Sequence, residues 1–141
     1  NAGCRWRQGR TVQMPIAEVS EKYGMSADTL RYYERIGLIP PVPRDKNGIR
    51  NYGAESCGWI ELMKCFRSAG VQVEALIEYV KLFREGDKTM DARKQILIEQ
   101  REVLNGRIEE MQAALERLNY KINNYEKMSA QMKRRFKKKS K

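Results

Sequence analysis

The apolar residues of this chain recur with the three-to-four-residue spacing of amphipathic helices over most of its length. This pattern predicts four short helices and then a much longer one, at residues 15–23, 26–36, 54–69, 73–83 and 89–127. Gly24, Gly37 and Gly70 follow the first three helices, where glycine commonly ends a helix because it adopts positive φ. The sequence therefore predicts a mainly α fold, with one clear linker at residues 85–88.

The first two helices are predicted to form a helix-turn-helix. Gly24 lies in the turn, and Ser26 is placed to cap the second helix by satisfying its free backbone N–H groups. Arg31 and Tyr32 fall on the outward side, where a guanidinium and a phenol suit contacts with base edges and phosphates. Tyr33 either faces the phosphates or packs in the core. Because many short helix pairs bind no DNA, a purely structural role for this pair stays open.

Residues 44–52, with the sequence RDKNGIRNY, predict a β-hairpin beside this helix pair. Asn47-Gly48 indicates a two-residue turn, because both residue types adopt positive φ readily. Ile49 lies between polar neighbours, as in a short half-buried strand. We interpret the hairpin as a wing that follows the phosphates or the minor groove, with a solvated charged hairpin as the alternative. Its cations are Arg44, Lys46 and Arg50.

From residue 89 the apolar positions alternate at three and four residues, as in a coiled coil. The seam contains Leu97, Leu104, Ile108, Met111, Leu115, Leu118, Ile122 and Tyr125, with Arg101 and Met132 in register. A helix about 58 Å long, at 1.5 Å per residue over 89–127, does not bury such a stripe alone. We therefore expect a homodimer whose paired recognition helices bind a pseudo-palindromic site. The seam does not reveal the direction of pairing.

The two ends of the chain depart from this pattern. Residues 1–13 show no periodicity and precede Met14. We therefore expect them to be either a disordered extension or an added segment that does not belong to the natural protein. Residues 129–141 include the run KRRFKKKSK, which we expect to be a disordered basic tail with nonspecific affinity for phosphates. The predicted domains are thus 14–84 for DNA binding and 89–128 for dimerisation.

Composition and charge favour a polyanionic partner. Lys and Arg number 28 against 18 Asp and Glu, a formal net charge of +10, which attracts nucleic acid. The chain has no His, and its cysteines (Cys4, Cys57 and Cys65) form no CxxC pair, so we expect no enzyme activity, metal site or cofactor. No apolar run is long enough to span a membrane and no secretory pattern is present, so a cytoplasmic location is expected.

The runs TLRYYERIGLIPP and RDKNGIRNY together resemble the DNA-binding domain of the MerR family of bacterial transcription regulators, over about residues 15–83. The resemblance implies a winged helix-turn-helix followed by an antiparallel coiled-coil dimer. It implies that the dimer binds promoters with an overlong spacer and that an effector makes it bend and untwist this DNA for RNA polymerase. The candidate DNA contacts are Thr29, Arg31, Tyr32 and Tyr33 on the helix, and Arg44, Lys46, Arg50 and Tyr52 in the wing.

Cys65 is the candidate effector site. Metal-sensing members of the family carry paired cysteines late in the dimerisation helix, whereas no Cys or His follows Leu118 here. The run WIELMKCFRSAG around Cys65 resembles the thiol-dependent branch of AdhR and NmlR-like regulators, which respond to reactive aldehydes and other electrophiles. Lys64 and Arg67 are expected to favour its thiolate. On chemistry alone, Cys65 as a small buried hydrophobic residue stays open, and Cys57 is expected to be structural.

Three other classes of function stay open. A coiled-coil scaffold that binds DNA nonspecifically would show the same charge and seam, and equal affinity for all DNA sequences would identify it. A MerR-type regulator with a different effector would keep specific binding but ignore aldehydes. A thiol peroxidase-like enzyme is the weakest alternative, because no resolving cysteine or obvious catalytic base accompanies Cys65.

Overall fold

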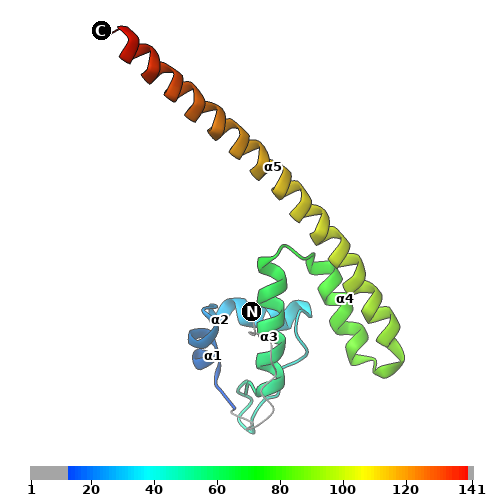
Figure 1. The fold of residues 1–141 in the computed structure, drawn as a ribbon. Helices are drawn as coiled ribbons and strands as arrows, with labels where there is room; N and C mark the ends of the chain where they lie inside the picture. The colour runs from blue at the N-terminus through cyan, green and yellow to red at the C-terminus, as the bar shows by residue number, and fades with distance from the viewer. Residues whose placement is uncertain (1–12, 140–141) are drawn as a thin grey trace. The chain divides into compact units, whose positions relative to one another are not determined.

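The computed structural model describes residues 13–139, without the side chain of Lys139 (Figure 1). The helices are α1 Ile16–Tyr23, α2 Ala27–Ile36, α3 Ala54–Ser68, α4 Val73–Arg84, the 3-10 helix η1 Asp87–Thr89, and α5 Met90–Lys139. The mainly α fold class is confirmed, and the first four helices agree with their predicted bounds to within one residue. The predicted extension, apart from residue 13, and Cys4 with it lie outside the described residues. The chain divides into two units between Arg101 and Glu102.

The ends of α1 and α2 follow from local chemistry. Ser26 caps α2 as predicted, because its Oγ accepts the backbone N–H of Thr29 at 3.0 Å. Gly24 ends α1 with φ 64°, and Gly37 ends α2 with φ 85°, a region that L side chains rarely adopt. The two helices, joined by residues 24–26, are the predicted helix-turn-helix.

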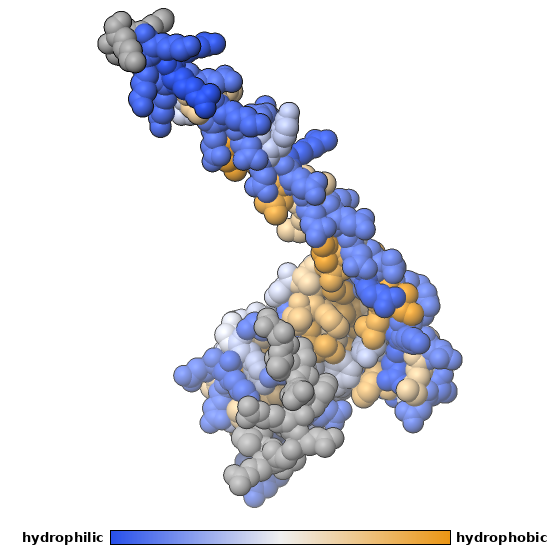
Figure 2. Space-filling view, viewed as in Figure 1, coloured by the Kyte–Doolittle hydropathy of each residue, from blue (hydrophilic) through white to orange (hydrophobic). Residues whose placement is uncertain are grey.

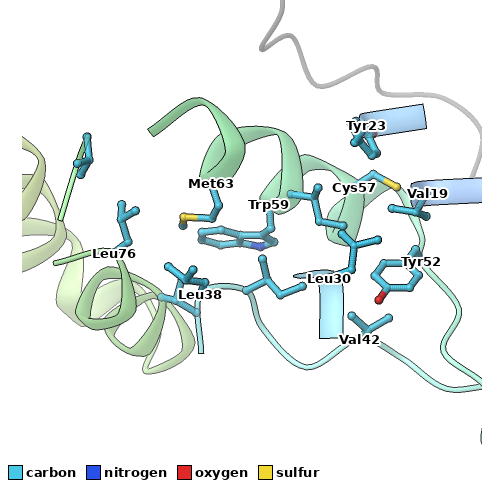
Figure 3. Close-up of a cluster of buried hydrophobic side chains, with 14 residues drawn as sticks. Val19, Tyr23, Leu30, Leu38, Val42, Tyr52, Cys57, Trp59, Met63 and Leu76 are labelled. Carbon is cyan, nitrogen blue, oxygen red and sulfur yellow. The ribbon is translucent and has the colours of Figure 1, made fainter. Parts of the chain in front are cut away.

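The core of the first unit joins α1–α4 to the segments between them (Figure 3). Trp59 of α3 lies edge-to-face against Phe83 and Tyr79 of α4, with ring centroids 4.9 Å and 6.1 Å away. Because α2 has only 10 residues, burial of Leu30 in this core rather than intrinsic helix stability holds it in place. The largest fully buried side chains are Val19, Leu30, Leu38, Ile39, Tyr52, Ile60, Met63 and Leu76.

The segment between α2 and α3 folds back on itself as the wing. Arg44 pairs with Arg50, and Tyr52 pairs with Met14, in antiparallel bridges. No longer strand forms within residues 13–139. The second bridge has backbone hydrogen bonds in both directions, Met14 N–H to Tyr52 O at 2.8 Å and Tyr52 N–H to Met14 O at 2.9 Å. The base of the wing is therefore fixed by the segment that precedes α1.

The tip of the wing differs from the predicted two-residue turn. The Asp45 N–H donates to Ile49 O at 2.8 Å, and the Gly48 N–H donates to Asp45 O at 3.0 Å, which encloses a three-residue loop. Asp45 Oδ1 favours this loop because it accepts the backbone N–H groups of Asn47 at 2.8 Å and Ile49 at 3.0 Å. The added loop residue leaves Ile49 exposed, so its predicted half-buried position is wrong.

The predicted linker at residues 85–88 forms a tight corner between α4 and α5. Gly86 adopts φ 101°, and the short η1 follows it at once. The buried Thr89 hydroxyl lies within hydrogen-bond distance of two carbonyl oxygens, Leu82 O at 2.6 Å and Gly86 O at 2.7 Å, to either of which its single proton can be donated. This side chain therefore ties the start of α5 to the end of α4.

α5 is a continuous helix of 50 residues. The expected disordered tail is wrong over residues 129–139, because Lys and Arg are good helix formers and the apolar spacing continues with Met128, Met132 and Phe136. Seven of the eight predicted seam residues are exposed in this single chain, and Figure 2 shows apolar patches along a mainly hydrophilic helix. No helix within residues 13–139 is long and apolar enough to span a membrane.

Candidate nucleic-acid interface

The outward face of α2 presents the side chains that were predicted to contact DNA. The Thr29 hydroxyl lies 2.8 Å from Ser26 Oγ, which holds it at the start of the helix. Arg31 is exposed and pairs with Asp28 at 3.0 Å, an exposed ion pair that contributes little and exchanges readily for another anion. This face can therefore offer a hydroxyl and a guanidinium to a nucleic acid.

The two tyrosines of α2 have different environments. Tyr32 is exposed, and the guanidinium of Arg35 lies 5.4 Å from the centre of its ring. Tyr33 is half-buried and packs against the core, so its ring is partly committed to structure. Arg35 is a further exposed cation on this helix that the sequence reasoning did not single out. Its place in the last turn, three residues after Tyr32, was the available signal.

The wing presents Lys46 and Arg44 at its surface. Lys46 lies exposed in the tip loop. One guanidinium nitrogen of Arg44 donates to Gly48 O at 2.9 Å, and the side chain remains half-exposed. Because the loop is closed by this bond and by Asp45, both cations are carried on an ordered hairpin.

Glu34 joins the wing to α2, and the sequence reasoning missed it. Its Oε2 accepts the backbone N–H of Val42 at 3.0 Å, and its Oε1 accepts Arg50 Nε at 3.3 Å. A nitrogen of Arg44 lies 3.9 Å from the same Oε1. The side chain of Glu34 is only 14% exposed. The only sequence signal was an acidic residue in the second half of α2, followed 10 to 16 residues later by the arginines of a basic hairpin, Arg44 and Arg50.

Tyr52 requires a correction. Its ring is completely buried in the core beneath the wing (Figure 3), so it offers no surface for the DNA contact expected of it. Burial raises the pKa of the phenol, and its hydroxyl has no hydrogen-bond partner among the described residues. The cause is the bridge to Met14, which turns the side chain inward. Tyr52 therefore supports the wing instead of contacting a ligand.

The two described cysteines occupy opposite environments. Cys57 is buried, and burial raises the pKa of its thiol, which fits the structural role expected of it. Cys65 is exposed on α3, so its alternative as a buried hydrophobic residue is wrong. The cations expected to favour its thiolate donate to backbone carbonyls instead: Lys64 to Tyr23 O, and Arg67 to Val71 O at 2.7 Å. The Cys65 thiol is thus accessible to solvent, with both of those cations bonded elsewhere.

Comparison with known proteins places this architecture in a family. The family model described as "MerR family regulatory protein" matches residues 15–52, which include the helix-turn-helix and the wing. A solved MerR-family transcriptional regulator from Listeria monocytogenes is 54% identical, with a TM-score of 0.79 over 80% of this chain and 86% of that one. This chain belongs to the MerR family.

Two further relatives of this MerR-family chain carry more specific descriptions. The HTH-type transcriptional regulator AdhR of Bacillus subtilis is 57% identical over 91 residues, which are 64% of this chain and 65% of AdhR, a little under two thirds of its length. The structure of HiNmlR, a MerR family regulator lacking the sensor domain, bound to promoter DNA, is 30% identical. Its TM-score is 0.74 over 84% of this chain and 94% of that one. The resemblance to AdhR and NmlR-like regulators is confirmed.

The relatives decide the class of function. An HTH-type transcriptional regulator of Haemophilus influenzae, itself uncharacterized, is 32% identical over 81% of this chain and 84% of its own length. These matches are all named transcriptional regulators, so the MerR-family chain is a transcriptional regulator and not an enzyme.

Proposed function

We propose that this regulator binds a pseudo-palindromic promoter as a homodimer, with α2 in the major groove and the wing on the adjacent backbone. The observation that supports this most directly is the α2 face, where Thr29, Arg31 and Tyr32 lie outward beside the ordered cationic wing. The HiNmlR relative, which is bound to promoter DNA in its structure, supports the same class of partner. Arg31 and Thr29 are the proposed base readers, and Tyr33, Arg44 and Lys46 the proposed phosphate contacts.

The dimer would form along the exposed seam of α5. Apolar side chains at heptad positions of a continuous helix lose this exposure when a second copy packs against them. The seam continues past Tyr125 to Met132 and Phe136, so we assign residues 129–139 to the same helix pair. An antiparallel pair, as the family resemblance implies, would set the spacing of the two recognition helices.

Arg31→Ala tests the proposed contact of α2. We expect operator affinity to fall by about 10-fold to 100-fold, since a specific arginine contact contributes about 1–3 kcal/mol. If Arg31 reads a base, its loss would relax the sequence preference at one position of the operator. If it contacts a phosphate, its loss would lower the salt slope by about one. Fluorescence anisotropy over a salt series measures the operator affinity and the salt slope, and the same titration with altered operators measures the sequence preference. Lys88→Ala removes an exposed cation outside the helix-turn-helix and the wing, and equal losses in the two variants would refute the proposed contact.

The regulatory part of the proposal is that Cys65 senses reactive aldehydes or other electrophiles. With an aldehyde, the thiol sulfur bonds to the carbonyl carbon, and the thiol proton goes to the carbonyl oxygen, so no oxidant or leaving group is needed. The exposed thiol and the similarity to AdhR support this assignment. The adduct would bias the dimer toward a form that bends and untwists an overlong promoter spacer for RNA polymerase.

Cys65→Ser is expected to abolish activation by a small reactive aldehyde while leaving operator affinity within about twofold. The measurement is run-off transcription with RNA polymerase from the promoter nearest the protein's own gene. Cys57→Ser is the matched control, because its thiol is buried and should be inaccessible to the aldehyde. Activation that survives in Cys65→Ser would assign the response to another effector site, and equal affinity for all DNA sequences would favour the nonspecific scaffold.

A further inference from the structure

We propose that Glu34 is a positioning residue that holds the wing against α2 through its hydrogen bonds to Val42 and Arg50, a set of contacts called the latch below. Arg50 then binds Glu34 instead of contacting DNA. The inference rests on the proposed promoter binding and deepens it. It reassigns Arg50, which the sequence alone placed among the DNA contacts. It also gives a role to the carboxylate that lies behind a predominantly cationic surface.

The contacts of the carboxylate connect three segments. Glu34 is on the recognition helix α2, Val42 is in the segment between α2 and the wing, and Arg50 follows the tip loop of the wing. Both carboxylate oxygens are used: Oε2 accepts the Val42 N–H at 3.0 Å, and Oε1 accepts Arg50 Nε at 3.3 Å. Arg44, 3.9 Å away, adds a second cation to the same oxygen. This side chain of α2 therefore binds the hairpin directly, in addition to the Met14–Tyr52 bridge at the base of the wing.

Burial distinguishes this pair from an ordinary surface ion pair. The side chains of Glu34 and Arg50 are 14% and 24% exposed, whereas Asp28, in the outer ion pair of the same helix, is 96% exposed. Loss of one partner from a shielded pair leaves the other with unsatisfied hydrogen-bonding groups, which costs more than loss of an exposed pair. Arg50 also has little accessible surface for a phosphate while this pair is intact.

The latch makes a prediction whose sign opposes simple electrostatics. A carboxylate near the DNA-binding face repels phosphate, so its removal should strengthen binding if charge alone mattered. If Glu34 instead holds the wing in register with α2, its removal should weaken binding, because the wing then loses its fixed position. The two interpretations therefore predict opposite changes in operator affinity.

Glu34→Gln is expected to lower operator affinity by about tenfold or more, the scale of a lost charged hydrogen bond. Glu34→Asp, which keeps the charge but shortens the side chain, should lose affinity as well. Asp28→Asn is the matched control, since it removes an exposed acid from the same helix and should bind operator equally or more tightly. Equal or tighter operator binding by Glu34→Gln would overturn the proposal.

Arg50→Gln separates the latch from a DNA contact. It should weaken operator binding about as much as Glu34→Gln does, because either change leaves the wing without its fixed position beside α2. Combined with Glu34→Gln, it should cost little more than either change alone, because both remove one interaction. Fully additive losses in the double variant would refute the latch, because a direct phosphate contact of Arg50 would add its own loss to that of Glu34→Gln. If the wild-type protein prefers no operator, the proposed promoter binding itself fails, which is a different result.

Discussion

Leu118→Asp is expected to convert the protein from a dimer to a monomer and to lower operator affinity by about 100-fold or more. Leu118 is 61% exposed in the single chain and lies in the middle of the α5 seam. In a coiled coil its side chain would pack between apolar neighbours of the partner helix, where an unpaired carboxylate is strongly unfavourable. A monomer also binds one half-site at a time. It therefore loses the gain of about 10²–10⁴ in affinity that a dimer obtains by binding both half-sites at once.

Sedimentation velocity measures the loss of the dimer, and a titration of the full operator measures the loss of affinity. Asn123→Asp is the matched control, because it introduces the same charge at an exposed position of α5 outside the seam. It should remain dimeric. A Leu118→Asp protein that still sediments as a dimer would mean that the exposed seam is not the dimer interface.

Local signals in the sequence were sufficient for the first four helices of this fold. The Ser26 cap and the terminal Gly24 and Gly37 depend on neighbouring residues alone, so their roles follow from side-chain and backbone chemistry within a few positions. The wing tip shows the limit of this reasoning. Asn47-Gly48 suggested a two-residue turn, but the side chain of Asp45 selects a loop one residue longer.

The candidate site depended on contacts between residues distant in sequence, which periodicity does not encode. Tyr52 is turned inward by pairing with Met14, 38 positions earlier. Glu34 and Arg50 are 16 positions apart, and neither residue alone predicts that they bind each other. The helix over residues 129–139 was missed for another reason, because a high density of like charge concealed an apolar spacing that continues to Phe136.

Leu30→Ala is expected to lower the free energy of unfolding of the first unit by about 2–5 kcal/mol. Leu30 is completely buried on the inner face of α2. Truncation removes its apolar contacts and leaves a cavity, and a helix as short as α2 has little stability of its own to compensate. Since the outer face of this helix carries the proposed DNA contacts, operator affinity should fall as well.

Urea unfolding followed by tryptophan fluorescence measures this loss. The chain has two tryptophans, so a Trp6→Phe background leaves Trp59 in the core as the reporter for this unit. With an m-value of about 1–3 kcal/mol per molar urea, the midpoint should fall by about 0.7 M or more. Tyr32→Ala, which truncates an exposed ring on the same helix, should cost about 1 kcal/mol or less.

The comparison of these two variants separates the two faces of the recognition helix. Tyr32→Ala should weaken operator binding while the protein remains folded, whereas Leu30→Ala should weaken binding because the helix itself is destabilised. High operator concentration should therefore raise the unfolding midpoint of Leu30→Ala, because DNA stabilises the folded state that it binds. An unchanged midpoint in free Leu30→Ala would contradict the argument, since it would mean that the core does not hold α2 in place.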